Sequence, residues 1–188
     1  GSTSTGEYSV LMGLIPTEGV RSMKNTQGKN LYMTIGNQLK REGYYSMAFH
    51  NGQYTYYSRN LTHENFGYGE FIGMGNGMEV GVEDTWPESD LEMMETTFDW
   101  YADKRPFSVY YMSISGHCNY SWDGNYMSKK NMDMVKDLPY SDTVKAYLAA
   151  NIELDKGIGY LLQELEKRGI ADDTVIVITA DHYPYGLE

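Results

Sequence analysis

Residues 141–182 read SDTVKAYLAANIELDKGIGYLLQELEKRGIADDTVIVITADH, and this stretch decides the fold class. Its first part places apolar side chains three or four positions apart, which predicts a helix over about residues 141–168. Gly169 is a typical residue for the end of such a helix. The β-branched run at residues 174–179 then predicts a buried strand, and Asp181-His182 follows directly after it. A long helix that leads into a short apolar strand is typical of an α/β domain.

The same alternation of helix and strand occurs earlier in the chain. We predict helices over about residues 30–41 and 89–103, and strands over residues 44–49 and 107–114. Strands that are separated by helices indicate a mainly parallel sheet flanked by helices. The Gly-rich residues 67–81 are expected to form a long surface loop. In a sheet of this kind, ligands bind beyond the carboxyl ends of the strands.

Composition limits the classes of function. The 188 residues are 41% hydrophobic, which is ample for one packed domain, and no repeat or linker divides the chain. Acidic residues outnumber basic ones by 26 to 15, and the net charge of -11 argues against a nucleic-acid-binding protein. The longest apolar stretch, residues 175–180, is much shorter than the roughly 20 residues that span a bilayer. A single cysteine, Cys118, excludes an internal disulfide.

Both ends of the chain are expected to be cut. Gly1-Ser2 and Leu187-Glu188 resemble the dipeptides that cloning sites leave behind. We therefore expect residues 1–188 to form a single partial domain that is truncated at both ends.

Three of the four histidines directly follow predicted strands. These are His50, His117 and His182, and a parallel sheet would bring them to the same edge. Any one of them taken alone is more often a satisfied loop or core residue. Three at one edge favour a functional site. Asp181 adds a carboxylate oxygen beside the His182 imidazole, a combination that suits a divalent ion such as Mn or Zn.

The opening segment predicts a helix N-terminus with a hydroxyl group beside it. Ser4 and Glu7 have the spacing of a capping box, and an apolar run follows them, so that Thr3 lies at the start of the helix. Exposed backbone N–H groups at such a position receive phosphate. A metal ion would lower the pKa of the Thr3 hydroxyl and make it a nucleophile. From the residues alone, a purely capping role for Thr3 is the more common case.

Arg59 follows the strand that ends at His50, and Tyr54, Tyr56 and Tyr57 lie beside it. The guanidinium of Arg59 matches phosphate oxygens, and tyrosines stack on or hydrogen-bond to polyols. An Arg in a loop is more often only a solvated surface charge.

Four short segments resemble those of one family. Residues 1–8 (GSTSTGEY) resemble the G-x-T-S-x-x-E-[FY] stretch of lipoteichoic acid synthases, which belong to the alkaline phosphatase and sulfatase superfamily. Residues 49–59 begin with FHNG and are similar to the family's F-H-G-N segment. Residues 113–117 (SISGH) resemble its L-S-N-H segment, and residues 181–183 match its D-H-Y segment. The segments occur in the family's order, and the resemblance covers almost the whole chain.

The resemblance implies a metal-activated nucleophile. In this family the Thr of the first segment is both nucleophile and metal ligand, which assigns both roles to Thr3. Asp181 and His182 would complete the ligands that this chain supplies. Mn is the ion expected first, with Zn or Mg as alternatives.

The resemblance also implies a substrate pocket. His117 would contact the substrate phosphate, and Arg59 would line the glycerol-phosphate pocket together with Tyr57 and His50. The substrate would be an anionic glycerophospholipid such as phosphatidylglycerol, or a glycerol-phosphate polymer. The parent protein would be anchored in a bacterial cell membrane, with this domain on the extracellular side.

Two departures from the family pattern matter. Tyr57 stands where the family has a Trp, and a further metal-binding acid comes from a strand upstream of the family's Thr, outside residues 1–188. The metal site of this chain is therefore expected to be incomplete, with weak metal binding and slow or no turnover.

Two other functions stay open. The same residues would serve a phosphodiesterase or phosphatase that passes the group to water. A non-catalytic module that binds surface polymers would use Thr3 only as a helix cap. The C/S-x-P-x-R signature of true sulfatases is absent, which disfavours sulfate-ester hydrolysis, and Cys118 does not replace it.

Overall fold

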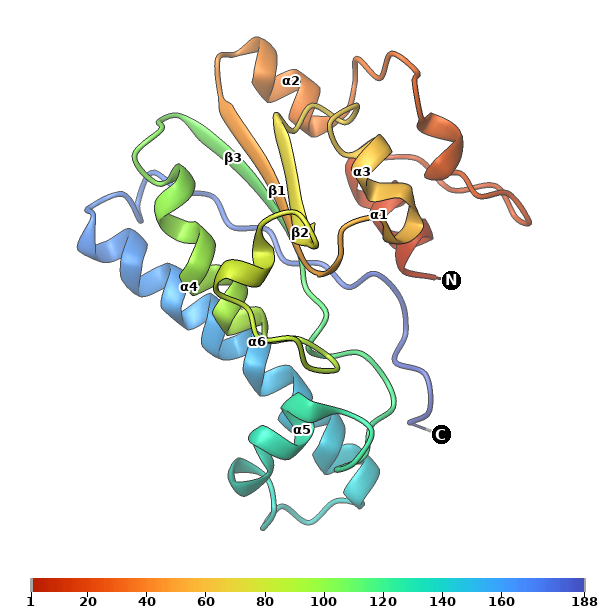
Figure 1. Ribbon diagram of the computed structural model, residues 1–188, viewed down its shortest axis with the longest axis vertical. Coiled ribbons are helices and arrows are strands. Elements are labelled where there is room, and N and C mark those ends of the chain that lie inside the picture. Colours follow the sequence, from red (N-terminus) through yellow and green to blue (C-terminus); the bar gives the residue numbers. More distant parts are fainter. Residues whose placement is uncertain (1, 188) are drawn as a thin grey trace.

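The centre of the molecule is a small parallel sheet. The computed structural model describes residues 2–187, so that Gly1 and Glu188, the outer residues of the two terminal dipeptides, lie outside the described part. Strands β1 (Tyr45–Gln53), β2 (Glu70–Met74) and β3 (Phe107–Met112) are all parallel. Their order in space is β2-β1-β3, with β1 in the middle (Figure 1). The predicted mainly parallel sheet flanked by helices is confirmed.

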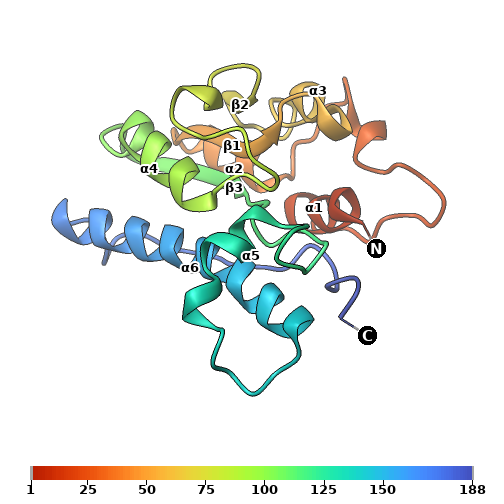
Figure 2. The ribbon, with the colours of Figure 1, turned by 60° about the horizontal axis from the view of Figure 1, so that its bottom comes forward.

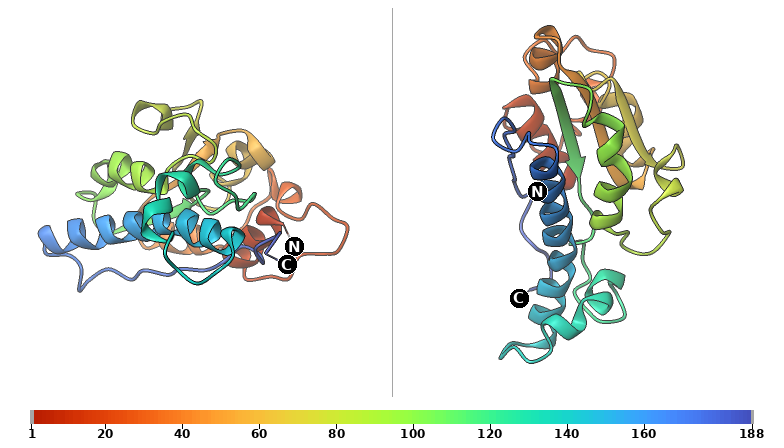
Figure 3. Two further views of the ribbon diagram at one scale, coloured as in Figure 1. Left: turned by 90° about the horizontal axis from the view of Figure 1, so that it is seen from below. Right: turned by 90° about the vertical axis from the view of Figure 1, so that its left-hand side faces the viewer.

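Helices cover both faces of this sheet. Helices α4 (Asp90–Tyr101) and α6 (Asp142–Lys167) pack on each other, and both contribute to the core cluster on one face; the left view in Figure 3 shows them side by side. Helix α1 (Thr3–Met12) lies on the opposite face, and the shorter helices α2 (Ile35–Arg41) and α3 (Arg59–Thr62) lie near it. Each face of the parallel sheet is thus covered by its own layer of helices.

The side chains of β1 alternate between these two layers. Met47 and Phe49 belong to the core cluster on the α4 and α6 side, whereas Ala48 belongs to the cluster on the α1 side. Successive strand residues point to opposite faces. By the same alternation His50 points toward the α1 face, and its neighbour Asn51 points toward the start of α4, where its amide meets Asp90.

The two long amphipathic helices agree with the sequence. The predicted helices over residues 89–103 and 141–168 are α4 and α6, each starting after a serine whose side chain caps the helix. The hydroxyl of Ser89 accepts from the N–H of Glu92, and that of Ser141 accepts from the N–H of Val144. Such caps satisfy backbone donors that the helix leaves unpaired.

Two predicted boundaries were wrong. The helix expected over residues 30–41 begins only at Ile35, because Thr34 caps it with its side chain. The strand expected to stop at Phe49 continues to Gln53, so that His50 lies inside β1 and not at its carboxyl end. Residues 50–52 remain in the strand and are buried between neighbouring strands and helices.

The Gly-rich residues 67–81 were wrongly predicted to be a surface loop. They contain β2, which pairs with β1 through the register Ala48↔Phe71. Phe71 is 3% exposed and packs on the α1 side of the sheet. Glycine weakens strand propensity, but burial between neighbours decides the outcome.

The strand predicted at residues 174–179 does not form in the described structure. The segment has no partner strand among residues 2–187, and Val175 and Val177 are 88% and 78% exposed. β-Branched residues favour a strand only where they pack against neighbours. The segment runs unpaired past the sheet and returns to the N-terminal end of α1 (Figures 1 and 2).

The remaining short helix, α5 (Tyr126–Lys130), packs on α6 below the sheet. Short 3-10 turns complete the connections at Lys24–Thr26, Tyr56–Ser58, Met78–Val80 and Met132–Met134. Within residues 2–187 no helix has both the length and the apolar character that crossing a bilayer requires.

Candidate active site

Thr3 lies at the first position of helix α1, as predicted. The cap is not the predicted pair Ser4 and Glu7. The N-cap is Ser2, whose N–H donates to the Thr5 hydroxyl at 2.8 Å. The capping box is therefore shifted by two residues, because Glu7 is drawn into the interior by a cation. Thr3 sits at the positive end of the helix dipole, where backbone N–H groups face outward.

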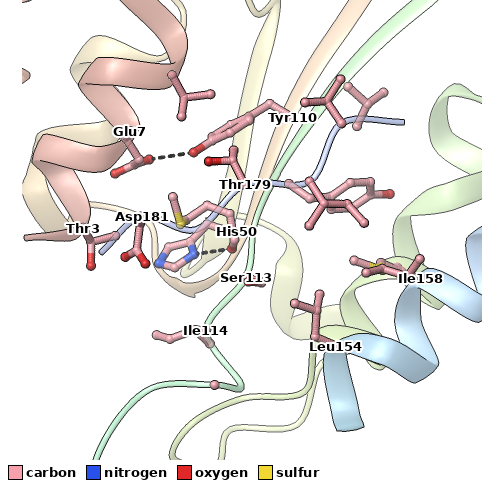
Figure 4. Close-up of a pocket in the computed structure, with 18 of the residues that line it drawn as sticks. Thr3, Glu7, His50, Tyr110, Ser113, Ile114, Leu154, Ile158, Thr179 and Asp181 are labelled. Atoms are coloured by element: carbon pink, nitrogen blue, oxygen red, sulfur yellow. Dashed lines mark hydrogen bonds between the residues drawn. The ribbon is translucent and has the colours of Figure 1, made fainter. Parts of the chain in front are cut away.

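The segment after residue 180 brings Asp181 and His182 to Thr3. The Thr3 Oγ1 atom lies 3.5 Å from His182 Nε2, and that nitrogen lies 3.2 Å from Asp181 Oδ2. Figure 4 shows the polar ends of Thr3 and Asp181 on the same side of the cavity, with the His50 ring beside them. Thr3 therefore lies next to Asp181 and His182, although almost 180 positions separate it from them in the sequence.

A glycine permits this approach. A Cβ atom at Gly6 would lie 2.2 Å from the backbone oxygen of Asp181 and 2.6 Å from its Cα atom. Such contacts are far inside van der Waals distance, so a larger residue at position 6 would push the segment away from α1. Gly6 lies one turn along the helix from Thr3, and it fixes how closely Asp181 approaches.

The three side chains fit a divalent ion. Two ligands held about 2.1 Å from one ion in tetrahedral geometry lie roughly 3.4 Å apart, close to the two distances given above. His182 Nδ1 lies 2.6 Å from the Tyr183 carbonyl oxygen, which needs an N–H there and leaves the Nε2 lone pair for a ligand. Within residues 2–187 no group of three His, Cys, Asp or Glu side chains gathers that could hold an ion. The Thr3 hydroxyl, which lies 3.5 Å from His182 Nε2, would be the third donor.

His50 lies beside this group but is deeply buried. Its Nδ1 atom is 2.8 Å from the Met112 carbonyl oxygen, so Nδ1 carries the proton and Nε2 is an acceptor. Burial and, to a smaller extent, the nearby Arg59 charge lower the pKa of His50 to about 3. His50 is thus a neutral imidazole that accepts a hydrogen bond, for example from a polyol hydroxyl.

Arg59 is not a solvated surface charge. It is 1% exposed, and its Nε and Nη2 atoms donate to the Glu7 carboxylate at 2.7–3.0 Å. Burial alone would raise the pKa of Glu7, but the Arg59 charge and the hydrogen bonds from His63 and Arg59 lower it to about 2. The Arg59 Nη1 atom is buried and has no hydrogen-bond partner among residues 2–187. A buried unpaired donor is costly, so this nitrogen is available to an anion in the cavity.

Tyr57 stands next to Arg59 in a strained backbone conformation. Its φ angle is 55°, and the Arg59 guanidinium lies 5.4 Å from the centre of its ring. A non-glycine residue at positive φ persists only where its surroundings hold it, and such residues gather at ligand sites. Tyr57 lines the same cavity as Thr3 and His50.

His117 is placed differently from the prediction. Strand β3 ends at Met112, five residues before His117, because the chain turns into a loop that α4 holds. The His117 side chain is exposed, its Nδ1 atom lies 2.6 Å from the Cys118 carbonyl oxygen, and its ring meets the edge of Trp86. It lines the cavity as well. No hydrogen bond or ion pair within residues 2–187 joins it to Thr3 or Asp181.

The whole sequence matches one protein family. A sequence model of the family described as Sulfatase matches residues 1–188. The chain belongs to the sulfatase family. The name describes the family and not the substrate of this chain.

Curated relatives of this sulfatase-family chain are lipoteichoic acid synthases. It is 27% identical over 190 residues to the lipoteichoic acid synthase of Staphylococcus saprophyticus, covering 97% of the chain and 28% of that protein. It is 25% identical over 167 residues to lipoteichoic acid synthase 1 of Bacillus subtilis, covering 84% of the chain and 24% of that protein. The chain therefore spans only about a quarter of the length of these relatives.

Solved structures show the same fold for the sulfatase-family chain. The lipoteichoic acid synthase LtaP from Listeria monocytogenes superposes with a TM-score of 0.71 at 23% identity, covering 91% of this chain and 41% of that one. The Streptococcus pyogenes phosphoglycerol transferase GacH, in complex with sn-glycerol-1-phosphate, has a TM-score of 0.62 at 15% identity, covering 89% and 45%. The resemblance to this family and fold is confirmed.

Several groups around the sulfatase-family site were missed by the sequence reading. Glu7 was interpreted as part of a helix cap, although it lies four residues after Thr3 and so shares a helix face with it. His63 Nε2 lies 3.3 Å from the Glu7 carboxylate, and the Tyr110 hydroxyl donates to Glu7 at 3.4 Å. These contacts join α1, α3 and β3. They had no local signal, because they depend on packing.

Proposed function

We propose that the chain forms part of a metal-dependent phosphoglycerol transferase. The observation that carries this proposal is the convergence of the Thr3 hydroxyl with His182 and Asp181 at the N-terminal end of α1. The similarity to lipoteichoic acid synthases supports it, and so does the structural likeness to a phosphoglycerol transferase solved with sn-glycerol-1-phosphate. The proposed donor is a phosphatidylglycerol-type lipid, and the product a cell-surface polymer such as lipoteichoic acid.

The proposed nucleophile is Thr3. A divalent ion, Mn²⁺ first with Zn²⁺ or Mg²⁺ as alternatives, held by Thr3, Asp181 and His182, would lower the pKa of the hydroxyl and offset phosphate charge. The Thr3 oxygen forms a bond to phosphorus while the bond from phosphorus to the diacylglycerol oxygen breaks. The proton that Thr3 loses is balanced by the proton that diacylglycerol gains. The result is a glycerophospho-Thr3 intermediate.

In the second step a hydroxyl of the acceptor attacks the same phosphorus. The bond between phosphorus and the Thr3 oxygen breaks, Thr3 regains a proton, and the acceptor hydroxyl loses one. The peptide N–H groups at the start of α1 favour negative charge on the phosphate in both steps. Positioning and charge complementarity are the main contributions of a protein to phosphoryl transfer.

The substrate contacts follow from the buried groups. Arg59 would donate its unpaired Nη1 to a phosphate oxygen, since Glu7 already holds its other two nitrogens. His117 would bind the same phosphate from the loop that follows β3. His50 would accept a hydrogen bond from the glycerol through Nε2, and Tyr57 would cover the glycerol beside Arg59.

A lipid donor also implies a place in the cell. Because phosphatidylglycerol resides in a bilayer, the proposal includes a membrane-anchored parent protein with this domain on the extracellular side of a bacterial cell membrane. The net charge of -11 argues against nucleic acid as the ligand but does not exclude a small anion that a few residues recognise locally.

The first test is metal affinity. We would titrate Mn²⁺ into the chain and into Thr3→Ala and Asp181→Ala by isothermal titration calorimetry. We expect affinity to fall by more than about 100-fold in both variants, since even outer groups of a metal site cost roughly 10- to 100-fold. Ser9→Ala removes a hydroxyl from the same helix and should leave the affinity unchanged. Equal affinity in all four proteins would contradict the site.

The second test looks for the covalent intermediate. Because weak metal binding and slow turnover are expected, the chain is incubated with a large excess of Mn²⁺ and phosphatidylglycerol vesicles for a time long enough for slow turnover. Peptides are then analysed by mass spectrometry. We expect a glycerophosphoryl group on Thr3 and none in Thr3→Ala. Added glycerol then separates the two enzyme classes: a transferase passes the group to glycerol, whereas release only to water identifies a phosphodiesterase. Metal-independent ligand binding without a covalent adduct would favour a binding module.

A further inference from the structure

Asp90 is a buried carboxylate that is bonded to the loop carrying His117. It is the first residue of α4 and is 0% exposed. One carboxylate oxygen accepts from the Ile114 N–H at 2.9 Å, and the other accepts from the Ser115 N–H at 3.3 Å and from the Ser115 hydroxyl. The segment between β3 and His117 is therefore attached to a helix rather than left free.

The same carboxylate reaches the central strand. Asn51 of β1 donates its side-chain N–H to Asp90 at 2.8 Å. Asn51 is 0% exposed and directly follows His50, which points to the other face of the sheet. Asp90 thus links the strand that carries His50 with the loop that carries His117.

Asp90 has no cation to balance it. Glu7 and Glu153, two other acids with little or no exposed surface, each pair with Arg or Lys, whereas no ion pair within residues 2–187 involves Asp90. A buried carboxylate without a cation lowers stability compared with an apolar residue of similar size. Its four neutral donors are two backbone N–H groups and the Ser115 hydroxyl of the site loop, and the Asn51 amide of β1. Asp90 therefore contributes to the position of the loop and of β1, and not to stability.

A second residue holds the loop from the opposite side. The side-chain N–H group of Asn125 donates to the Ser115 carbonyl at 3.1 Å and to the His117 carbonyl at 2.7 Å. Its own oxygen accepts from the Ser128 N–H and caps α5. Asn125 is 1% exposed. The backbone around His117 is thus fixed at both ends while its imidazole stays exposed.

We propose that Asp90 and Asn125 are positioning residues that hold residues 114–117 so that the His117 imidazole meets the substrate phosphate. The proposal rests on the phosphate-binding role proposed for His117. Neither residue touches the substrate. Both act through hydrogen bonds to the loop backbone.

The test compares amide exchange with ligand affinity. Asp90→Asn keeps the shape of the side chain but replaces an accepting oxygen by an NH₂ group that faces N–H donors. We expect the Ile114 and Ser115 amides to exchange roughly 10- to 100-fold faster, as when a hydrogen bond to a charged group is lost. Affinity for sn-glycerol 1-phosphate in the presence of Mn²⁺ should fall roughly 10-fold, as for the loss of an outer-shell partner.

Two further variants keep the test decisive. Thr97→Val removes a buried hydroxyl from the same helix. That hydroxyl bonds to the Met93 carbonyl and to the Tyr111 hydroxyl of β3 but to none of residues 114–117, so the variant should leave both amides and the affinity unchanged. Ser115→Ala removes only the hydroxyl that bonds to Asp90, and it should show a smaller change in the same direction. It takes the place of Asp90→Asn if that variant does not fold.

The outcomes separate the two proposals. Amide exchange in Asp90→Asn that equals exchange in Thr97→Val would overturn the positioning role. Faster exchange with unchanged affinity would overturn the link to substrate. If the unaltered chain binds no glycerol phosphate, the proposed function fails, while the amide exchange still decides whether Asp90 holds the loop.

Discussion

The two sides of the candidate site are built in opposite ways. On one side Arg59 and Glu7 are almost completely buried and joined by three hydrogen bonds of 2.7–3.0 Å. On the other side Asp181 and His182 lie on an unpaired segment, and Thr3 is joined to His182 by one contact of 3.5 Å. The proposed substrate side is part of the folded core, whereas the proposed metal side lies nearer the surface.

This difference separates stability from function. Removing a group from the Arg59 side should unfold or loosen the protein, because a buried charge would lose its partner. Changing the Asp181 side should alter ligand binding and leave the fold intact, because Asp181 and His182 are only half-buried and substitutions outside the core usually change stability little. Four variants or conditions test this contrast.

The largest effect is expected for Glu7→Gln. The substitution leaves the Arg59 guanidinium buried without a counter-charge, which typically costs about 3–5 kcal/mol. We would measure the free energy of unfolding by urea titration at pH 7. Glu18→Gln, at an exposed position, serves as the control and should match the unaltered chain. Equal stability of the two variants would show that the buried pair does not hold the fold.

Lowering the pH should cause part of the loss of stability that is expected for Glu7→Gln. The pKa of Glu7 is lowered from 4.5 to about 2, so its carboxylate stabilises the fold above pH 4.5. This stabilisation is lost as the pH falls from 4.5 toward 2, and its full size is about 3 kcal/mol by linkage. Urea titrations at pH 6 and pH 3 should show the loss in the unaltered chain and a smaller one in Glu7→Gln. An identical pH dependence in both proteins would exclude Glu7 as the cause.

Gly6→Ala should separate metal binding from stability. The added methyl group would lie 2.2 Å from the Asp181 oxygen and must displace the segment, so Mn²⁺ affinity should fall roughly 10- to 100-fold. Alanine favours a helix more than glycine does, so the melting temperature should not fall. Gly159→Ala is the matched control, because nothing lies within 4 Å of a Cβ there. Unchanged Mn²⁺ affinity in Gly6→Ala would mean that the segment adjusts freely.

The smallest effect is expected on the unpaired segment itself. Val175 is 88% exposed, so Val175→Thr should change the free energy of unfolding by less than about 0.5 kcal/mol. The same substitution at Val82, which is 4% exposed, should cost about 1–3 kcal/mol because the hydroxyl is buried. A large effect at Val175 would indicate that this segment packs against the rest of the protein.

Periodic and capped segments were predictable from the sequence. The helices α4 and α6 follow from their apolar spacing and their capping serines, since these signals are local. Strand β2 was missed because its glycines resemble a loop, and only pairing with β1 reveals it. The strand expected at residues 174–179 failed for the opposite reason, since its composition favours a strand but no neighbour pairs with it.

The sequence by itself determined the fold class, the place of Thr3 at a helix start and the residue types that suit a metal and a phosphate. Those features depend on local spacing and on chemical identity. Only the tertiary structure decided that Glu7 holds Arg59, that Gly6 admits Asp181 and that Asp90 holds the His117 loop. Each of these contacts joins residues far apart in the chain, and such contacts form only when packing brings the segments that carry them together.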